Sequence, residues 1–233
     1  MNVAGVPLLL LRLEGPLQSW GTRARWGVRD TGREPSKSGV LGILGCALGY
    51  PRGDARLATE LDASLHLGVR EDRPGKPLQD FHTIKGYPLA ANGANRESEG
   101  EQTEYHILSP KDYLQDASFL AVISGDDKLL VRCHAALMNP AWPYYLGRRC
   151  CVPSRPLLID LNEKFASIRK ALENIPWDPG RKYRKIPAEL RCVEETERGE
   201  YRRQDRPPRD PARLFGFRQV TEYYVPNPAA KEA

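Results

Sequence analysis

The chain has 233 residues, of which 40% are hydrophobic and 28% are charged, a composition that excludes intrinsic disorder. Its length suffices for one well-buried core, or for one domain with a smaller appendage. The formal net charge of +5 favours a polyanionic partner such as a nucleic acid.

The cysteines and the N-terminal residues bear on the cellular compartment. The five cysteines lack paired spacing, which argues against a disulfide framework and against a metal site. The chain begins without the basic region of a signal peptide, and its first apolar run is far shorter than the roughly 20 residues that span a bilayer. We therefore expect a cytoplasmic protein with reduced thiols, without a membrane segment, and without a metal or other cofactor.

The first fifty residues predict a strand followed by a helix. The apolar run at residues 8–13 is typical of a central strand covered on both faces. Residues 35–49 predict a helix that begins with small polar residues and carries four glycines: Gly39, Gly42, Gly45 and Gly49. A glycine inside a helix costs roughly 0.5–1 kcal/mol relative to alanine. Four of them predict a close approach to this helix, either by a sheet or by a ligand at the helix start.

The segment that joins this strand to this helix contains basic residues with aromatic residues among them. They are Trp20, Arg23, Arg25, Trp26, Arg29, Arg33 and Lys37. Rings that stack on bases, next to cations that bind phosphates, suit single-stranded nucleic acid. The helix start at residues 35–39 adds unpaired N–H groups and the charge of Lys37, which predicts a phosphate site. The alternative is that Ser36 or Ser38 simply caps the helix.

The next elements complete an alternating order of strands and helices. We predict a half-buried strand at residues 64–70, a protruding hairpin or thumb at 79–116, a buried strand at 117–123, a helix at 129–138 and a short strand at 156–159. This order is that of the ferredoxin-like fold, which RNA-recognition motifs share. The predicted class is therefore α+β, with a ferredoxin-like, RNA-binding domain at residues 1–160.

The remaining residues, 161–233, predict a small C-terminal α+β subdomain. We predict a helix at 162–174 and a strand pair at 188–195 and 214–225. A polar, proline-rich stretch at residues 199–211 separates the two strands. Residues 181–218 hold 12 lysines and arginines against 7 aspartates and glutamates, an excess as large as that of the whole chain. Such a run is either a binding surface or a solvated face.

Residues suited to catalysis are few. The four histidines are scattered, and His82 alone stands near a lysine, Lys85, at the base of the predicted thumb. This pair could cleave RNA without a metal, with His82 as acid or base and Lys85 stabilising the phosphorane. The alternative is a histidine that only binds or stacks there. Farther along, Tyr144 and Tyr145 precede Arg148 and Arg149, a combination that suits either an RNA clamp or a protein contact.

An ordered set of motifs resembles the CasD subunits of type I-E CRISPR Cascade complexes. They lie at residues 10–21, 31–49, 80–83, 113–119, 143–149 and 222–225. The resemblance extends along most of the chain, and it is weak at residues 164–213 and at the thumb tip. It implies a non-catalytic subunit that holds the 5′ handle of the CRISPR RNA in antiviral defence and caps the filament of backbone subunits. The implied partners are that RNA, the backbone and large subunits and, indirectly, the target DNA.

Two alternatives to this function remain open. A related branch, in type I-C systems, cleaves precursor CRISPR RNA with a tyrosine, a lysine and a histidine, so the chain could be a metal-independent endoribonuclease. A protein–protein adaptor would instead have no affinity for RNA.

We expect the RNA contacts to come from the basic and aromatic residues described above and from polar neighbours. The candidate residues are Gln18, Trp20, Arg25, Arg33, Lys37, Ser38, His82, Tyr145, Arg148 and Arg149. If Arg33 and Lys37 bind phosphates at the surface, replacing both by glutamate weakens RNA binding and leaves the fold intact.

Overall fold

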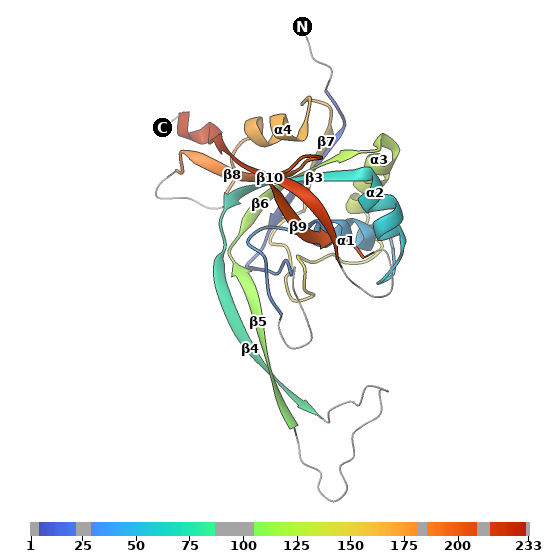
Figure 1. Ribbon diagram of the computed structural model, residues 1–233, viewed down its shortest axis with the longest axis vertical. Coiled ribbons are helices and arrows are strands. Elements are labelled where there is room, and N and C mark those ends of the chain that lie inside the picture. Colours follow the sequence, from blue (N-terminus) through green and yellow to red (C-terminus); the bar gives the residue numbers. More distant parts are fainter. Residues whose placement is uncertain (1–4, 22–28, 87–104, 181–185, 209–214, 232–233) are drawn as a thin grey trace, which may run out of the picture.

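A computed structural model describes residues 5–21, 29–86, 105–180, 186–208 and 215–231 (Figure 1). Arg25 and the tip of the predicted thumb lie outside these residues, as do the side chains of residues 84–86 and 105–107. The described part is a mixed α/β structure with two antiparallel sheets and few helices.

The larger sheet has seven strands in the order β7-β1-β6-β3-β8-β10-β9. Its strands are β1 (Leu8–Glu14), β3 (Leu65–Arg73), β6 (Ser118–Gly125), β7 (Leu158–Asn162), β8 (Glu189–Glu195), β9 (Tyr201–Arg206) and β10 (Gly216–Pro226). All neighbouring pairs are antiparallel. The three strands that follow residue 161 continue the same sheet beyond β3, while the division into domains at residue 160 stays a prediction.

Strand β1 lies between two cores, which explains its unbroken apolar run. Leu9, Leu11 and Leu13 pack with α1 (Lys37–Ala47) and α3 (Asp127–Met138) on one face of the sheet. Leu8 and Leu10 pack on the opposite face with α4 (Ile168–Asn174). Because successive side chains of a strand point to opposite faces, a strand covered on both sides is apolar at successive positions, here residues 8–11, and its buried Arg12 is paired with Asp72. The prediction of a doubly covered strand is confirmed.

A long hairpin connects β3 to β6. Strands β4 (Lys76–Gly86) and β5 (Tyr105–Gln115) pair antiparallel over their whole length, and β2 (Leu17–Gln18) joins β5. Figure 1 shows this hairpin extending away from the seven-stranded sheet. It begins three residues before the predicted insertion at 79–116.

Several elements differ from the sequence predictions. A turn of π-helix, η1 (Leu57–Leu61), and the short α2 (Asp62–Ser64) precede β3, and η2 (Pro228–Lys231) follows β10. Helix α4 begins at Ile168 rather than near residue 162, because Ser167 caps it by accepting a hydrogen bond from Lys170 N–H. Strand β9 lies in the polar, proline-rich stretch, where no strand was predicted.

The described residues contain neither a candidate membrane-spanning helix nor a candidate metal site. No helix there is long and apolar enough to cross a membrane. No group of three or more histidine, cysteine or acidic side chains there could hold a metal ion. The five cysteines are free thiols, and burial raises the pKa of Cys133 and Cys192 to about 12.

Candidate functional site

The start of α1 is already occupied by the protein's own groups. The Ser36 hydroxyl accepts a hydrogen bond from Gly39 N–H at 3.2 Å, so the capping alternative is confirmed. The Lys37 N–H donates to Asp205 Oδ2 at 3.0 Å, and Arg218 Nε contacts the same carboxylate at 2.7 Å. Burial alone would raise the pKa of Asp205, but the hydrogen bond and charge of Arg218 lower it below its usual value. An internal carboxylate therefore fills the position predicted for a phosphate.

Lys37 points into the protein rather than toward solvent. Its side chain is 1% exposed, and Nζ lies 3.0 Å from Asp62 Oδ1 and 2.8 Å from Glu195 Oε1. In this conformation Lys37 joins α1 to α2 and β8, and no surface ligand can reach its charge. We therefore assign Lys37 a structural role.

Gln18 and Trp20 are also buried, and they fix the chain against α1. The Gln18 amide donates to the carbonyls of Leu13 and Ala117, at 3.2 and 2.8 Å, and its Oε1 accepts from Trp20 Nε1 at 3.0 Å. The Trp20 ring packs on Gly39, where an added Cβ would lie 2.8 Å from Cε3. The predicted close approach to the helix is thus made by this ring.

The other helix glycines differ in the space around them. At Gly45 a Cβ would lie 2.6 Å from Leu57 Cδ2, and Gly49 ends the helix with φ +78°. At Gly42, by contrast, an added Cβ would meet no atom within 4 Å. Packing therefore explains Gly39 and Gly45 but leaves Gly42 unexplained.

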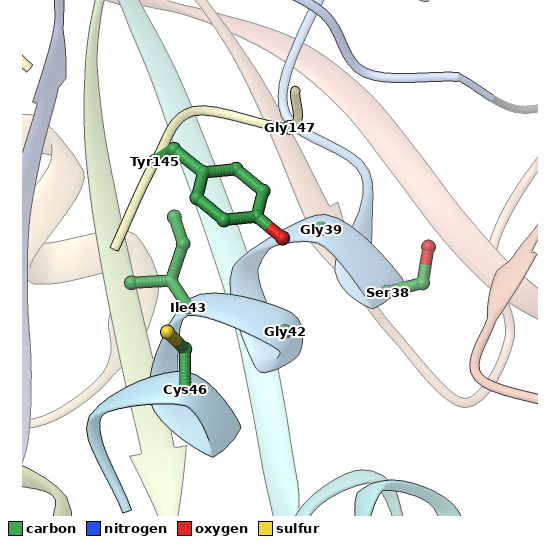
Figure 2. A pocket seen from close by; sticks show the side chains of 7 residues that line it. All are labelled: Ser38, Gly39, Gly42, Ile43, Cys46, Tyr145 and Gly147. Carbon is green, nitrogen blue, oxygen red and sulfur yellow. The ribbon is translucent and has the colours of Figure 1, made fainter. Parts of the chain in front are cut away.

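Gly42 faces a small cavity between α1 and the loop at residues 143–149 (Figure 2). The cavity measures about 170 Å³, and its lining residues are Ser38, Gly39, Gly42, Ile43, Cys46, Tyr145 and Gly147. Figure 2 shows the Tyr145 ring above the helix, with its hydroxyl near Gly39. A floor of small side chains with one isoleucine, Ile43, beside an aromatic ring suits a planar group such as a base.

Arg148 holds this loop in place. Its guanidinium donates to the carbonyls of Asp112 and Arg29, at 3.0 and 2.6 Å, and lies 4.6 Å from the centre of the Tyr113 ring. These contacts tie the loop to β5. Arg149, the next residue, is exposed. Arg148 is therefore engaged within the protein, whereas its neighbour Arg149 can contact a ligand at the surface.

The other candidates lie apart from the cavity. Arg33 is 61% exposed and forms two 3.2 Å contacts with Glu71. His82 lies on the hairpin, where Nε2 is 2.7 Å from Asp80 Oδ2. The side chain of Lys85, its proposed catalytic partner, lies outside the described residues. Of the candidates, the structure brings together Ser38 and Tyr145, with Arg148 as their support and Arg149 beside them in sequence.

Sequence reasoning missed the cavity because its floor carries no charge or conspicuous motif. In the sequence, Gly42 is one of four helix glycines and Cys46 is one of five cysteines. A helical repeat of small side chains, at Ser38, Gly42 and Cys46, is the signal that could have found it.

Together these features define a mixed α/β protein with a long hairpin and an aromatic, small-residue cavity. The chain matches the model of the family described as CRISPR-associated protein (Cas_Cas5) over residues 8–221. This chain therefore belongs to that CRISPR-associated family, as the sequence motifs predicted.

One curated relative and two solved structures are similar to this chain. The chain is 34% identical over 162 residues to the CRISPR system Cascade subunit CasD of Escherichia coli (strain K12), covering 65% of this chain and 69% of that protein. A structure described as "Crystal structure of Cas protein" has a TM-score of 0.68 and 36% identity over 95% of this chain and 96% of the other. A chain of a "CRISPR RNA-guided surveillance complex" has a TM-score of 0.75 and 32% identity over 96% and 92%.

Proposed function

We propose that this chain is an RNA-binding subunit of a Cascade surveillance complex that holds the 5′ handle of the CRISPR RNA in antiviral defence. The printed names of its relatives, a Cascade subunit and a chain of an RNA-guided surveillance complex, support this role. In that assembly it caps the filament of backbone subunits, next to the large subunit, and meets target DNA only through the guide. The cytoplasmic location stays a prediction.

The strand order supports a ferredoxin-like, RNA-binding unit at residues 1–160. Four strands lie in the order β7-β1-β6-β3, and α1 and α3 pack on one face of β1. The chain order of these elements, strand, helix, strand, strand, helix, strand, is that of the ferredoxin-like fold. We assign the β4–β5 hairpin as the thumb, which reaches between the guide RNA and the neighbouring backbone subunit, and residues 161–233 as the C-terminal subdomain.

The cavity beside Gly42 carries the proposal for the RNA site. One handle base stacks on Tyr145 over the floor of α1, while Ser38 and Arg149 offer a hydroxyl and a cation at its edge. Arg33 and His82 are exposed enough to meet flanking phosphates or bases. Gln18, Trp20, Lys37 and Arg148 act by positioning these groups. Arg25 stays a predicted contact.

Replacing Gly42 by leucine tests this site. The added side chain enters open space, so the fold stays intact and helix propensity rises by about 0.5–1 kcal/mol. Filling the cavity weakens binding of handle RNA by roughly tenfold, the equivalent of one lost base-stacking contact. The measurement is a titration of labelled handle RNA into the full chain at fixed salt.

The matched control is Val131→Leu on the exposed face of α3, which leaves RNA affinity unchanged. Wild-type affinity in Gly42→Leu would exclude the cavity as the site. If neither variant nor the wild type binds handle RNA, the chain is an adaptor and the proposed function fails.

We further propose that the chain does not cleave RNA. The His82 imidazole lies against Asp80 on the hairpin, away from the cavity that carries the RNA site. With repeat RNA in EDTA we expect stable binding without cleavage, and no effect of His82→Ala on the length of the bound RNA. Specific cleavage that His82→Ala abolishes would instead support the metal-independent endoribonuclease.

A further inference from the structure

A second cavity lies on the face of the sheet that α4 covers. It measures about 270 Å³ and has apolar walls, which include Ile159, Ile175 and Pro176. Two arginines, Arg12 of β1 and Arg155 of the segment before β7, line the same cavity. Nothing in the proposed RNA site involves these residues.

The ion pairs around this cavity carry an excess of positive charge. Among the ion pairs of the described residues, four arginines, Arg12, Arg70, Arg73 and Arg155, meet three carboxylates, those of Glu14, Asp72 and Asp178. Two other clusters among the described residues are balanced. One pairs Lys37, Arg206 and Arg218 with Asp62, Glu195 and Asp205, and the other pairs Arg33, Arg191 and Arg203 with Glu34, Glu71 and Glu222. An unbalanced charge at a buried site is costly unless an anion compensates it.

One of the two arginines that line the cavity has a buried donor without a partner among the described residues. Arg155 Nε is buried and has no hydrogen-bond partner among the described residues. Arg12 is 5% exposed, and its Nη1 donates to Asp72. A buried donor without an acceptor destabilises a fold, so Arg155 Nε calls for an acceptor in this cavity.

We propose that this cavity binds the carboxylate of an acidic residue or chain end, carried by an apolar segment of a partner protein. The excess is a single charge, which one carboxylate balances, and guanidinium groups bind carboxylates through paired hydrogen bonds. The walls are proline and isoleucine, without an aromatic ring on which a base could stack.

The site is accessible to such a segment. Strand β7 forms one edge of the seven-stranded sheet, and its Ile159, beside the cavity, is 43% exposed. An apolar side chain of the partner covers Ile159 while the carboxylate reaches Arg155 and Arg12.

The test uses N-acetyl-leucine, which carries a carboxylate beside an apolar side chain, and its uncharged amide, N-acetyl-leucinamide. Ligand-detected NMR with the full chain is expected to show saturable binding of the acid and none of the amide. Arg155→Gln is expected to weaken binding of the acid by roughly tenfold, because it removes a charge-assisted hydrogen bond. Arg132→Gln, which changes an exposed arginine on α3, leaves binding unchanged.

A second variant covers the case in which Arg155→Gln fails to fold. Ile159→Glu changes an exposed side chain, and its carboxylate at the mouth of the cavity is expected to weaken binding of the acid by a similar factor. The proposal is overturned if the amide binds as well as the acid, if no acid binds, or if no folded variant at Arg155 or Ile159 changes its affinity. Displacement of the acid by a uridine pentanucleotide would assign the cavity to RNA instead.

Discussion

Lys37→Glu is expected to lower the free energy of unfolding by about 3–5 kcal/mol or more, the range for breaking a buried ion pair by removing one partner. The change replaces an ammonium between Asp62 and Glu195 by a third carboxylate, with only 1% of the side chain exposed. The predicted loss is a large part of the stability of a single domain. Urea denaturation followed by circular dichroism measures it.

Lys37→Met provides the matched control. It removes the charge but keeps the length of the side chain, and Arg206 and Arg218 still neutralise the carboxylates at 2.7 and 3.9 Å. The loss should therefore be smaller than for glutamate. A stability of Lys37→Glu within about 1 kcal/mol of the wild type, the scale of exposed ion pairs, would show that Lys37 is exposed in solution and would restore it as an RNA contact.

Arg70→Met is expected to destabilise the chain by about 3–5 kcal/mol for a related reason. The guanidinium is fully buried, and Nη1 donates to the carbonyls of Leu172 and Ile175 at 2.6 and 2.7 Å. Nε contacts Asp72 Oδ1 at 2.6 Å. The substitution leaves these carbonyls, at the end of α4, without their donor in a dry environment. Urea denaturation is again the measurement.

Arg169→Met is the control on α4 itself. Arg169 is 56% exposed, pairs with Glu173 and lies over the Tyr223 ring, so its loss is expected to cost less than about 1 kcal/mol. Equal effects of Arg70→Met and Arg169→Met would mean that the guanidinium of Arg70 is not the cap that holds α4 on the sheet.

Much of the core followed from the pattern of apolar residues. The leucines of β1 predicted that both of its faces are covered. The alternation of Leu65, Leu67 and Val69 predicted one covered face of β3, but the prediction of a half-buried strand was wrong, because α4 covers the other face at Gly68 and Arg70. Turn residues and a proline after α3 predicted the end of that helix near residue 138. The prediction for β1 and the predicted end of α3 succeeded because each depends on residues that are neighbours in the sequence.

The buried charges were not predictable in this way. Strand β9 is polar, yet its Asp205 is buried against Arg218 of the neighbouring strand. Lys37 meets Glu195 across 158 residues of sequence. A sequence shows that such residues are charged, but only the fold brings their partners together.

The partners of the basic residues at 181–218 could not be predicted from the sequence either. The excess charge of this stretch suggested a binding surface as one option. In the structure, Arg191, Arg206 and Arg218 all contact carboxylates of the protein itself. For these three arginines, internal pairing accounts for the charge.

The cavity that we propose as the RNA site was predicted only in part. The loop at residues 143–149 was selected for its tyrosines and arginines, and Tyr145 does line the cavity. The helix start was selected for its free N–H groups, two of which bond to Ser36 and Asp205. The sequence could not reveal that a carboxylate from β9 takes that position.

Photocrosslinking tests the RNA site most directly. The assembled complex is formed with CRISPR RNA in which 4-thiouridine replaces uridine in the 5′ handle, then irradiated and digested, and the crosslinked peptides are sequenced. We expect crosslinks in this chain at residues 143–149 and in α1, and their loss in Gly42→Leu. Handle crosslinks that fall only in other subunits, or only elsewhere in this chain, would contradict the proposed role of the cavity.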